Sequence, residues 1–188
     1  MVKKNACIFI SGEGSNLKNL LKRSRDYYFP ISIKLVISNN PKAKGINFAK
    51  KYSIPYLIIN TRFRNYENTI FKKLKNHKIN IICLAGYMKI ISKNFLKVFK
   101  KKIINIHPSL LPKYKGLNTF KRVLQNKEVK TGCTVHYVND ILDGGKIISQ
   151  KSFYLKSNFN EEDLRKKTQN LEYSAYPEAI IKIFRFNY

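Results

Sequence analysis

Apolar residues form short continuous runs over the first hundred residues, and amphipathic segments separate these runs. The runs do not alternate strictly between apolar and polar residues, as a strand with one solvent-exposed face would. Such unbroken runs are typical of parallel strands covered on both faces. They occupy residues 6–11, 33–38, 55–59, 79–85 and the stretch that begins at Ile103. Between them, apolar residues recur at helical spacing in segments that begin at Leu17 and that span 43–51, 65–76 and 92–99. This alternation predicts an α/β fold with a doubly wound, mostly parallel, Rossmann-like sheet.

The pattern changes after residue 130. Residues 131–138 and 146–154 form two extended segments that a short acidic turn joins, so we expect an antiparallel addition to the sheet. A final helix is predicted from about Glu161 to Phe184, and Pro177 should kink or divide it because proline cannot donate a helical hydrogen bond. With 188 residues, the chain is predicted to form a single domain, 1–188, with halves of about 1–100 and 101–188.

Several polar segments follow the carboxyl ends of predicted strands, where ligands bind in doubly wound sheets. These segments are 12–16, 86–91 and 105–109. The first leads from a strand through Gly12 and Gly14 into a helix, with Ser15 or Asn16 as the predicted N-cap. Such a turn can place backbone N–H groups around a phosphate. The spacing matches neither GxGxxG nor a P-loop, so an ordinary strand-to-helix turn remains the alternative.

Three polar residues near the end of the parallel part suggest acyl-transfer chemistry. Asn105 and His107 lie two apart in a predicted strand, so their side chains share a face. Asp143 stands before Gly144 and Gly145 in the acidic turn, where a purely turn-forming role is the alternative. An amide donor, an imidazole and a carboxylate together can stabilise an oxyanion and move protons. Their order in the chain does not establish that they meet.

The chain carries 37 Lys and Arg against 11 Asp and Glu, a formal net charge of +26. Such a balance suggests a polyanionic partner, and RNA binding is the serious rival interpretation. The lysines are spread over the whole chain, however, and Asn, Ile and Tyr are abundant while Trp is absent. This joint skew is what an AT-rich coding sequence produces, so we interpret the charge mainly as compositional drift. A positive field would still attract anionic substrates.

Composition also bounds the class of protein. Hydrophobic content of 44% indicates a folded chain, and no apolar run approaches the roughly 20 residues that a membrane-spanning helix needs. The apolar run near the N-terminus is too short for a secretory signal. Cys7, Cys83 and Cys133 are far apart and fit neither a disulfide framework nor a zinc site. We therefore expect a cytoplasmic protein without a metal.

Five motifs, in this order along the chain, resemble the folate-dependent formyltransferases, and within them the group that acts on glycinamide ribonucleotide. The motifs are Ile10–Leu17 (ISGEGSNL), Leu84–Met88 (LAGYM), Asn105–Leu117 (NIHPSLLPKYKGL), Thr131–His136 (TGCTVH) and Leu142–Gly145 (LDGG). The resemblance extends from about residue 6 to residue 184, and such a set of motifs is highly specific.

The resemblance implies transfer of a formyl group from 10-formyltetrahydrofolate to the amine of 5-phosphoribosylglycinamide, in the third step of purine synthesis. The catalytic triad it implies is Asn105, His107 and Asp143. The ribonucleotide and its phosphate would contact Gly12, Gly14, Ser15, Asn16, Gln169 and Glu172. The folate would contact Arg64, Met88, Lys89, Ile90, Ile91, Asn105, Asp140, Ile141 and Leu142. The first half of the domain would thus bind phosphate, and the second half would bind folate and carry the catalytic residues.

Three departures from the family pattern bear on substrate contacts. Lys89 replaces a common arginine and loses its planar fork of donors, and Asn118 and Phe120 replace histidines. None of them removes the triad.

These roles set expectations for the chemistry. Protonated His107 and Asn105 would donate to the oxyanion, and a nearby Asp143 would raise the pKa of His107. No covalent intermediate is required. We expect His136 to be structural, because it lies in an alternating strand, and His77 to be a solvated surface residue.

Two alternatives remain, one a related enzyme and one a protein from a different functional class. Methionyl-tRNA formyltransferases share the catalytic core and would suit the charge, but they normally carry a further tRNA-binding domain. A basic RNA-binding protein with a decayed site is the second alternative, although no basic stripe interleaved with aromatic residues is visible. We expect small-molecule substrates as partners, neither membrane nor nucleic acid, and a monomer or homodimer.

Overall fold

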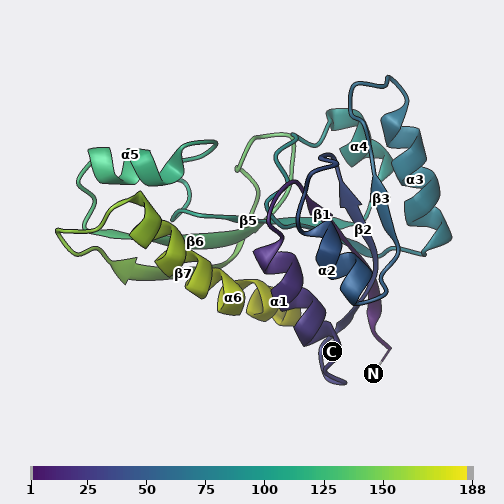
Figure 1. Ribbon diagram of the computed structural model, residues 1–188, viewed down its shortest axis with the longest axis horizontal. Coiled ribbons are helices and arrows are strands. Elements are labelled where there is room, and N and C mark those ends of the chain that lie inside the picture. Colours follow the sequence, from purple (N-terminus) through teal and green to yellow (C-terminus); the bar gives the residue numbers. More distant parts are fainter. Residues whose placement is uncertain (1, 186–188) are drawn as a thin grey trace. The chain divides into compact units, whose positions relative to one another are not determined.

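In the computed structural model, which describes residues 2–185, strands and helices alternate along the chain (Figure 1). The strands are β1 Lys4–Ile10, β2 Ile31–Ser38, β3 Tyr56–Ile58, β4 Ile81–Leu84, β5 Lys102–His107, β6 Lys130–Tyr137 and β7 Ile147–Tyr154. The helices are α1 Ser15–Ser24, α2 Ile46–Lys51, α3 Tyr66–Asn76, α4 Lys93–Val98, α5 Thr119–Gln125 and α6 Glu161–Arg185.

The seven strands form one sheet in the order β3-β2-β1-β4-β5-β6-β7. Strand β1 pairs in parallel with β2 and with β4, and β2 pairs in parallel with β3. Strands β6 and β7 pair antiparallel, with Cys133 opposite Lys151. The predicted fold class is therefore confirmed: a mostly parallel α/β sheet with an antiparallel addition and a final helix.

The chain divides into two compact units, Met1–Ile104 and Asn105–Tyr188. In the first unit, the chain moves from β1 outward to β3 and then returns to β4 on the other side of β1. Because parallel crossovers are right-handed, this reversal places α1 and α2 on one face of the sheet and α3 and α4 on the other. The ring of Phe95 in α4 lies 6.2 Å from that of Phe9 in β1 and 4.8 Å from that of Phe71 in α3. Strand β1 is buried on both faces, which explains its unbroken apolar run.

In the second unit, α6 packs against both β6 and β7 (Figure 1). Its buried side chains include Leu164, Ala175, Tyr176 and Ile180. Pro177 lies inside α6 without dividing it, so the predicted division is wrong. The buried residues on both sides of Pro177 hold the helix together, and their packing outweighs the hydrogen bond that proline cannot make.

Two helices differ from the sequence expectations. Helix α2 starts at Ile46 rather than at residue 43, because turns occupy the segment between Pro41 and Gly45. Helix α5 was not predicted at all, since its seven residues bury only Thr119 and Val123 and so carry little periodicity. Ser92 is the N-cap of α4, because its hydroxyl accepts a hydrogen bond from the Phe95 N–H at 2.9 Å. Within residues 2–185, no helix combines the length and the apolar character needed to cross a bilayer.

The turn between β1 and α1 depends on Gly14. Helix α1 starts at Ser15, its N-cap is Gly14 with φ of 75°, and no side chain caps it, so the predicted cap at Ser15 or Asn16 is wrong. A Cβ atom on Gly14 would lie 2.5 Å from the Cα of Gly45. The left-handed backbone and this close approach explain why glycine, which has no side chain to act as a cap, occupies the N-cap position of α1.

Gly14→Ala is expected to lower the free energy of unfolding by about 2 kcal/mol or more, because alanine adds left-handed strain and a backbone clash. Urea unfolding of the purified variant measures this change. Gly12→Ala is the matched control, since a Cβ atom on Gly12 would have nothing within 4 Å. Equal stability of the two variants would mean that the β1–α1 turn is not held against Gly45.

Candidate active site

The side chains of Asn105 and His107 leave β5 on the same face, as the sequence predicts, and reach a polar cluster inside the second unit. Asn105 is half-buried and His107 is 6% exposed. The Nδ2 atom of Asn105 lies 3.3 Å from Nε2 of His136 on β6. The Nδ1 atom of His107 lies 3.3 Å from Oδ2 of Asp143. The structure therefore brings together the three residues predicted to be catalytic. His136 is a fourth member of the same cluster.

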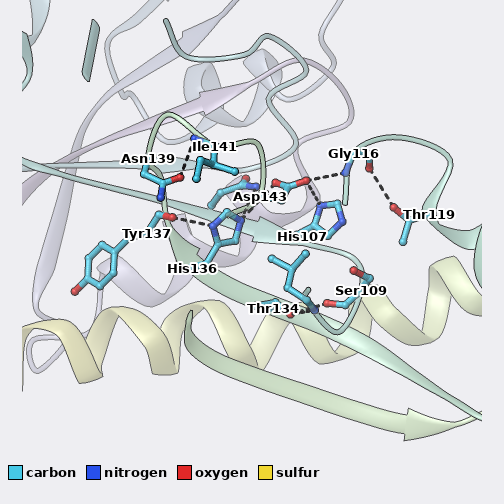
Figure 2. Close-up of polar contacts among 12 residues, drawn as sticks. His107, Ser109, Gly116, Thr119, Thr134, His136, Tyr137, Asn139, Ile141 and Asp143 are labelled. Atoms are coloured by element: carbon cyan, nitrogen blue, oxygen red, sulfur yellow. Dashed lines mark hydrogen bonds and ion pairs between the residues drawn. The ribbon is translucent and has the colours of Figure 1, made fainter. Parts of the chain in front are cut away.

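Each ring nitrogen of His107 faces an oxygen atom, and Figure 2 shows the contact with Asp143. The backbone carbonyl of Tyr114 lies 2.8 Å from Nε2. A carbonyl oxygen only accepts hydrogen bonds, so Nε2 carries the proton of a neutral ring and donates it to Tyr114. Nδ1 then faces the Asp143 carboxylate. The proton that the site gains and loses is the one between Nδ1 and Asp143.

The pKa of His107 differs from the expectation. Burial of the ring lowers the pKa of His107 below its ordinary value, and the Tyr114 carbonyl and the Asp143 carboxylate oppose this effect only in part. Asp143 thus acts in the predicted direction, but the net shift is downward because desolvation of the ring outweighs the nearby carboxylate. At neutral pH the ring is mostly uncharged, which suits a group that accepts a proton.

The carboxyl group of Asp143 stays ionised despite its burial. Burial raises its pKa, but the His136 ring, the hydrogen bond from the N–H of Gly116 and the His107 ring together hold the pKa of Asp143 below its usual range. The Gly116 N–H donates to Oδ2 at 2.8 Å (Figure 2). The side chain is 8% exposed. Asp143 therefore does more than form a turn, because its carboxylate is the centre of the cluster.

His136 is the site residue that sequence reasoning missed. Its side chain is 2% exposed, and Nδ1 lies 2.8 Å from the backbone carbonyl of Tyr137, to which it donates. In the neutral ring, Nε2 therefore accepts the hydrogen bond from Asn105, and it lies 3.6 Å from Oδ1 of Asp143. His136 thus orients the Asn105 amide. Its signal in the sequence is its place at the end of the Thr131–His136 motif, in a strand whose residues 131–136 are all buried.

The turn between β6 and β7 presents Asp143 to the cluster. The Asn139 side chain accepts a hydrogen bond from the Ile141 N–H at 3.1 Å, and the Gly144 N–H donates to the Ile141 carbonyl at 3.0 Å. Asp143 itself has a left-handed backbone, with φ of 48°. A Cβ atom on Gly145 would lie 1.7 Å from the Tyr137 carbonyl oxygen, so only glycine fits where the turn rejoins β7. The tip residues Asp140, Ile141 and Leu142, predicted to contact folate, are exposed.

Buried hydroxyl groups tie the loop after β5 to β6. Thr134 is fully buried; its hydroxyl donates to the Ser109 carbonyl at 2.6 Å and accepts from the Leu111 N–H at 3.0 Å. The Ser109 hydroxyl donates to the Lys113 carbonyl at 2.6 Å. The two hydrogen bonds of the Thr134 hydroxyl therefore hold the loop after β5 against β6.

In the first unit, Ser11 joins the ends of neighbouring strands. Its hydroxyl donates to the Asn39 side chain at 2.5 Å and accepts from the Met88 N–H at 2.8 Å. The Asn40 side chain donates to the Ser11 carbonyl at 2.8 Å. The segments after β1, β2 and β4 therefore meet at one edge, as the doubly wound topology predicts.

The predicted substrate contacts divide between the two units. In the first unit, Gly12 is exposed, Gly14 and Asn16 are buried and Ser15 is half-buried at the start of α1, whose first turn holds no acidic residue. Met88, Lys89 and Ile90 are exposed after β4, Ile91 is half-buried, and Arg64 is exposed before α3. In the second unit, Gln169 and Glu172 are half-buried on α6. Their contacts with substrates remain predictions.

Over residues 2–185, no group of three or more His, Cys, Asp or Glu side chains has the arrangement of a metal site.

Comparison with known proteins gives consistent matches. The family described as formyl transferase matches residues 4–180. A phosphoribosylglycinamide formyltransferase of Haemophilus influenzae is 38% identical over 185 residues, which cover 96% of this chain and 87% of that protein. The trifunctional purine biosynthetic protein adenosine-3 of Drosophila melanogaster is 37% identical over 95% of this chain, which spans 14% of that longer protein. The crystal structure of a phosphoribosylglycinamide formyltransferase from Brucella melitensis has a TM-score of 0.91 at 34% identity, covering 100% of this chain and 98% of that one.

Proposed function

Because the chain belongs to the formyl transferase family, we propose that it transfers a formyl group from 10-formyltetrahydrofolate to the amine of 5-phosphoribosylglycinamide. The observation that carries this proposal is the buried cluster of Asn105, His107, His136 and Asp143. The match to the Haemophilus influenzae enzyme over 87% of its length supports the same acceptor. The reaction is the third step of purine synthesis.

Asn105 stabilises the charge that develops during the transfer. Attack of the amine on the formyl carbon produces a tetrahedral intermediate whose oxygen is negatively charged. An amide nitrogen carries two N–H groups, and Asn105 directs one of them to His136. The other donates to the oxyanion. His136 fixes the amide, so this donor is in place before charge develops.

The His107–Asp143 pair moves the proton. The attacking nitrogen becomes positively charged as it bonds to the carbon, and it must lose a proton. The pair accepts that proton at Nδ1 of His107, beside the Asp143 carboxylate 3.3 Å away. It then returns the proton to the departing nitrogen of the folate, so the protein ends the cycle unchanged. No covalent bond to the protein forms.

The ribonucleotide phosphate binds at the start of α1, through Gly12, Gly14, Ser15 and Asn16. A helix N-terminus attracts anions, and Lys18 is exposed one turn further along α1. Gln169 and Glu172, one turn apart on α6, contact the ribonucleotide itself. The high positive charge of the chain assists this binding by attracting an anionic substrate.

Folate binding uses two sets of exposed apolar side chains with polar neighbours. Met88 and Ile90 are 68% and 69% exposed, and Ile141 and Leu142 are 59% and 53% exposed. Exposed apolar side chains with polar neighbours can bind the apolar and polar parts of a small molecule. Arg64, Lys89 and Asp140 supply charged groups for the polar parts of the folate.

The cytoplasmic location, the single domain and the monomeric or homodimeric state form part of this proposal. Cys7, Cys83 and Cys133 are buried, and within residues 2–185 no disulfide joins them, which fits a reducing compartment. Methionyl-tRNA formyl transfer is the second candidate, and the net charge of +26 is the observation in its favour.

Genetic complementation tests the proposed acceptor. The gene for this chain should restore growth without added purines to a bacterial strain that lacks its own phosphoribosylglycinamide formyltransferases. The His107→Ala variant, expressed at the same level, should not. Growth with both the native gene and the His107→Ala gene, or with neither of them, would contradict the proposal.

Ser15→Asp is expected to raise the Kd for 5-phosphoribosylglycinamide by about 10-fold or more, because the new carboxylate repels the phosphate at the helix N-terminus. Isothermal titration with the ribonucleotide measures it. Ser24→Asp places the same charge at the other end of α1 and is the matched control. Unchanged affinity in Ser15→Asp would place the phosphate elsewhere.

A further inference from the structure

We propose that Glu128 is a positioning residue for the His107–Asp143 pair and acts through the Lys113–Gly116 loop. Glu128 lies three residues after the end of α5. Within residues 2–185, no hydrogen bond or ion pair joins Glu128 directly to His107 or to Asp143. Its influence on the pair passes through two backbone groups of the loop. The proposal rests on the proposed function for its kinetic readout alone.

The loop delivers one backbone group to each member of the pair. The Tyr114 carbonyl accepts the hydrogen bond from Nε2 of His107 at 2.8 Å. Two residues later, the Gly116 N–H donates to Oδ2 of Asp143 at 2.8 Å. The orientation of the imidazole and of the carboxylate therefore depends on where this short segment lies.

Backbone geometry alone does not hold the loop in place. Tyr114 has φ of 58°, in the left-handed region that a bulky residue rarely adopts. Such a conformation costs free energy and persists only where the surroundings impose it. The loop therefore needs anchors, and its side chains supply them.

Glu128 is the main side-chain anchor. Its Oε1 atom accepts a hydrogen bond from the Tyr114 hydroxyl at 2.7 Å and contacts the Lys113 ammonium at 2.8 Å. These two bonds hold the pKa of Glu128 below its ordinary value. The Glu128 side chain is 19% exposed, and its partner Lys113 is 65% exposed. One carboxylate oxygen thus fixes two successive residues of the loop.

Arg122 is a second side-chain anchor of the loop and contacts Tyr114 and Lys115. Its guanidinium lies 5.4 Å from the centre of the Tyr114 ring, and its Nη1 atom donates to the Lys115 carbonyl at 2.6 Å. The ring is thus held at its hydroxyl by Glu128 and at its face by Arg122. Because the ring and the carbonyl belong to the same residue, holding the ring holds the carbonyl that His107 contacts.

The test compares Glu128→Ala with the native protein in two independent readouts. Nitrogen-15 NMR of the imidazole side chains reports which ring nitrogen of His107 carries the proton, and it needs no substrate. Steady-state kinetics with 5-phosphoribosylglycinamide reports turnover. The groups that set the charge of His107 are Asp143, His136, Arg122 and the Tyr114 carbonyl. The variant removes none of these groups and acts through the loop, which carries the Tyr114 carbonyl and also the Gly116 N–H that contacts Asp143.

In the native protein we expect nitrogen-15 chemical shifts that place the proton on Nε2 of His107. In Glu128→Ala we expect these shifts to move towards the average values of a ring that exchanges between its two tautomers. We expect kcat to fall by about 10- to 100-fold, with KM for the ribonucleotide changed by less than about 3-fold, because a displaced supporting group costs rate rather than binding. The acid limb of kcat should move to lower pH, because the Tyr114 carbonyl raises the pKa of His107. Tyr114→Phe keeps the ring and loses only the hydroxyl, so it should change both readouts in the same direction and by less.

Glu178→Ala is the matched control, since it removes the ion pair with Lys151 elsewhere in the same unit. Native NMR signals and native kcat in Glu128→Ala would overturn the proposal. A fall in kcat with an unchanged His107 signal, or an equal fall in Glu178→Ala, would also overturn it, because either result indicates general destabilisation. If the native protein does not formylate the ribonucleotide, the proposed function fails, and the NMR comparison still decides the role of Glu128.

Discussion

Replacement of His107 by alanine is expected to lower kcat for formyl transfer by about 10²- to 10⁴-fold, the usual contribution of a positioned acid–base group. The imidazole is buried between the Tyr114 carbonyl and the Asp143 carboxylate, and in our account it carries the proton between the two nitrogens of the reaction. KM for 5-phosphoribosylglycinamide should change little, because the ring acts in the transition state and not on the phosphate. Steady-state kinetics on the purified variant measures both constants.

His77→Ala is the matched control for this prediction. The chain has three histidines, and His77 follows α3 in the first unit, where its backbone carbonyl, not its ring, accepts a hydrogen bond from Asn5. Its replacement should leave kcat unchanged. Turnover of His107→Ala within a few-fold of the native value would remove His107 from the mechanism.

Asp143→Asn is the second change with a large expected effect. The amide has nearly the same shape and still offers an oxygen to the Gly116 N–H, but it has no charge with which to stabilise a protonated His107. We expect kcat to fall by about 10²- to 10⁴-fold, within the range for acid–base groups. Asp140→Asn, at the exposed tip of the same turn, is the control, and it should alter KM for the folate rather than kcat. An Asp143→Asn variant with native kcat would contradict the role of the carboxylate.

The same variant has a signature in the pH dependence of stability. The pKa of Asp143 is lower in the folded chain than in the unfolded chain. Its ionisation therefore stabilises the fold above the unfolded pKa of about 3.9, and this contribution disappears as the pH falls through the folded pKa. Urea unfolding should find a stability difference between the native protein and Asp143→Asn that is constant near neutral pH and shrinks in acid. A difference that grows on acidification would mean that Asp143 is not held ionised in the fold.

The sequence predicts the parallel half of the fold well because burial on both faces leaves unbroken apolar runs. Strand β4, Ile81–Leu84, lies inside the predicted run 79–85, and β1 begins two residues before its predicted start. Helix α5 escapes prediction because its few buried residues leave no helical period, and α2 loses its first turn to the loop around Pro41. Local pattern thus locates an element wherever the element buries a full face.

The site is predictable in part for a similar reason. Asn105 and His107 share a face because residues two apart in a strand must do so, and the structure agrees. His136 and the backbone groups of Tyr114 and Gly116 escaped prediction, since their roles depend on strand neighbours and on a loop path that no local pattern encodes. The net shift of the His107 pKa could not be predicted from the sequence. Asp143 raises this pKa, but burial of the ring, which the sequence does not reveal, lowers it by more.

The scarcity of acidic residues makes their placement informative. Only 11 Asp and Glu accompany 37 Lys and Arg, yet several of the 11 hold loops together. Glu67 accepts hydrogen bonds from the Ser92 hydroxyl at 2.6 Å and from the Asn94 amide at 3.2 Å, and Glu128 anchors Lys113 and Tyr114. We infer that drift towards lysine is tolerated on the surface, where charges are solvated, and less so where a carboxylate supports a site.

A formyl-transfer assay on the purified protein tests the central claim most directly. Consumption of 10-formyltetrahydrofolate is followed in parallel with 5-phosphoribosylglycinamide and with charged initiator tRNA as the acceptor. Our account predicts turnover with the ribonucleotide, loss of that turnover in His107→Ala, and none with the tRNA. Turnover with the tRNA alone would contradict it and would make the charge of +26 the functional feature, and no turnover with either acceptor would contradict it as well.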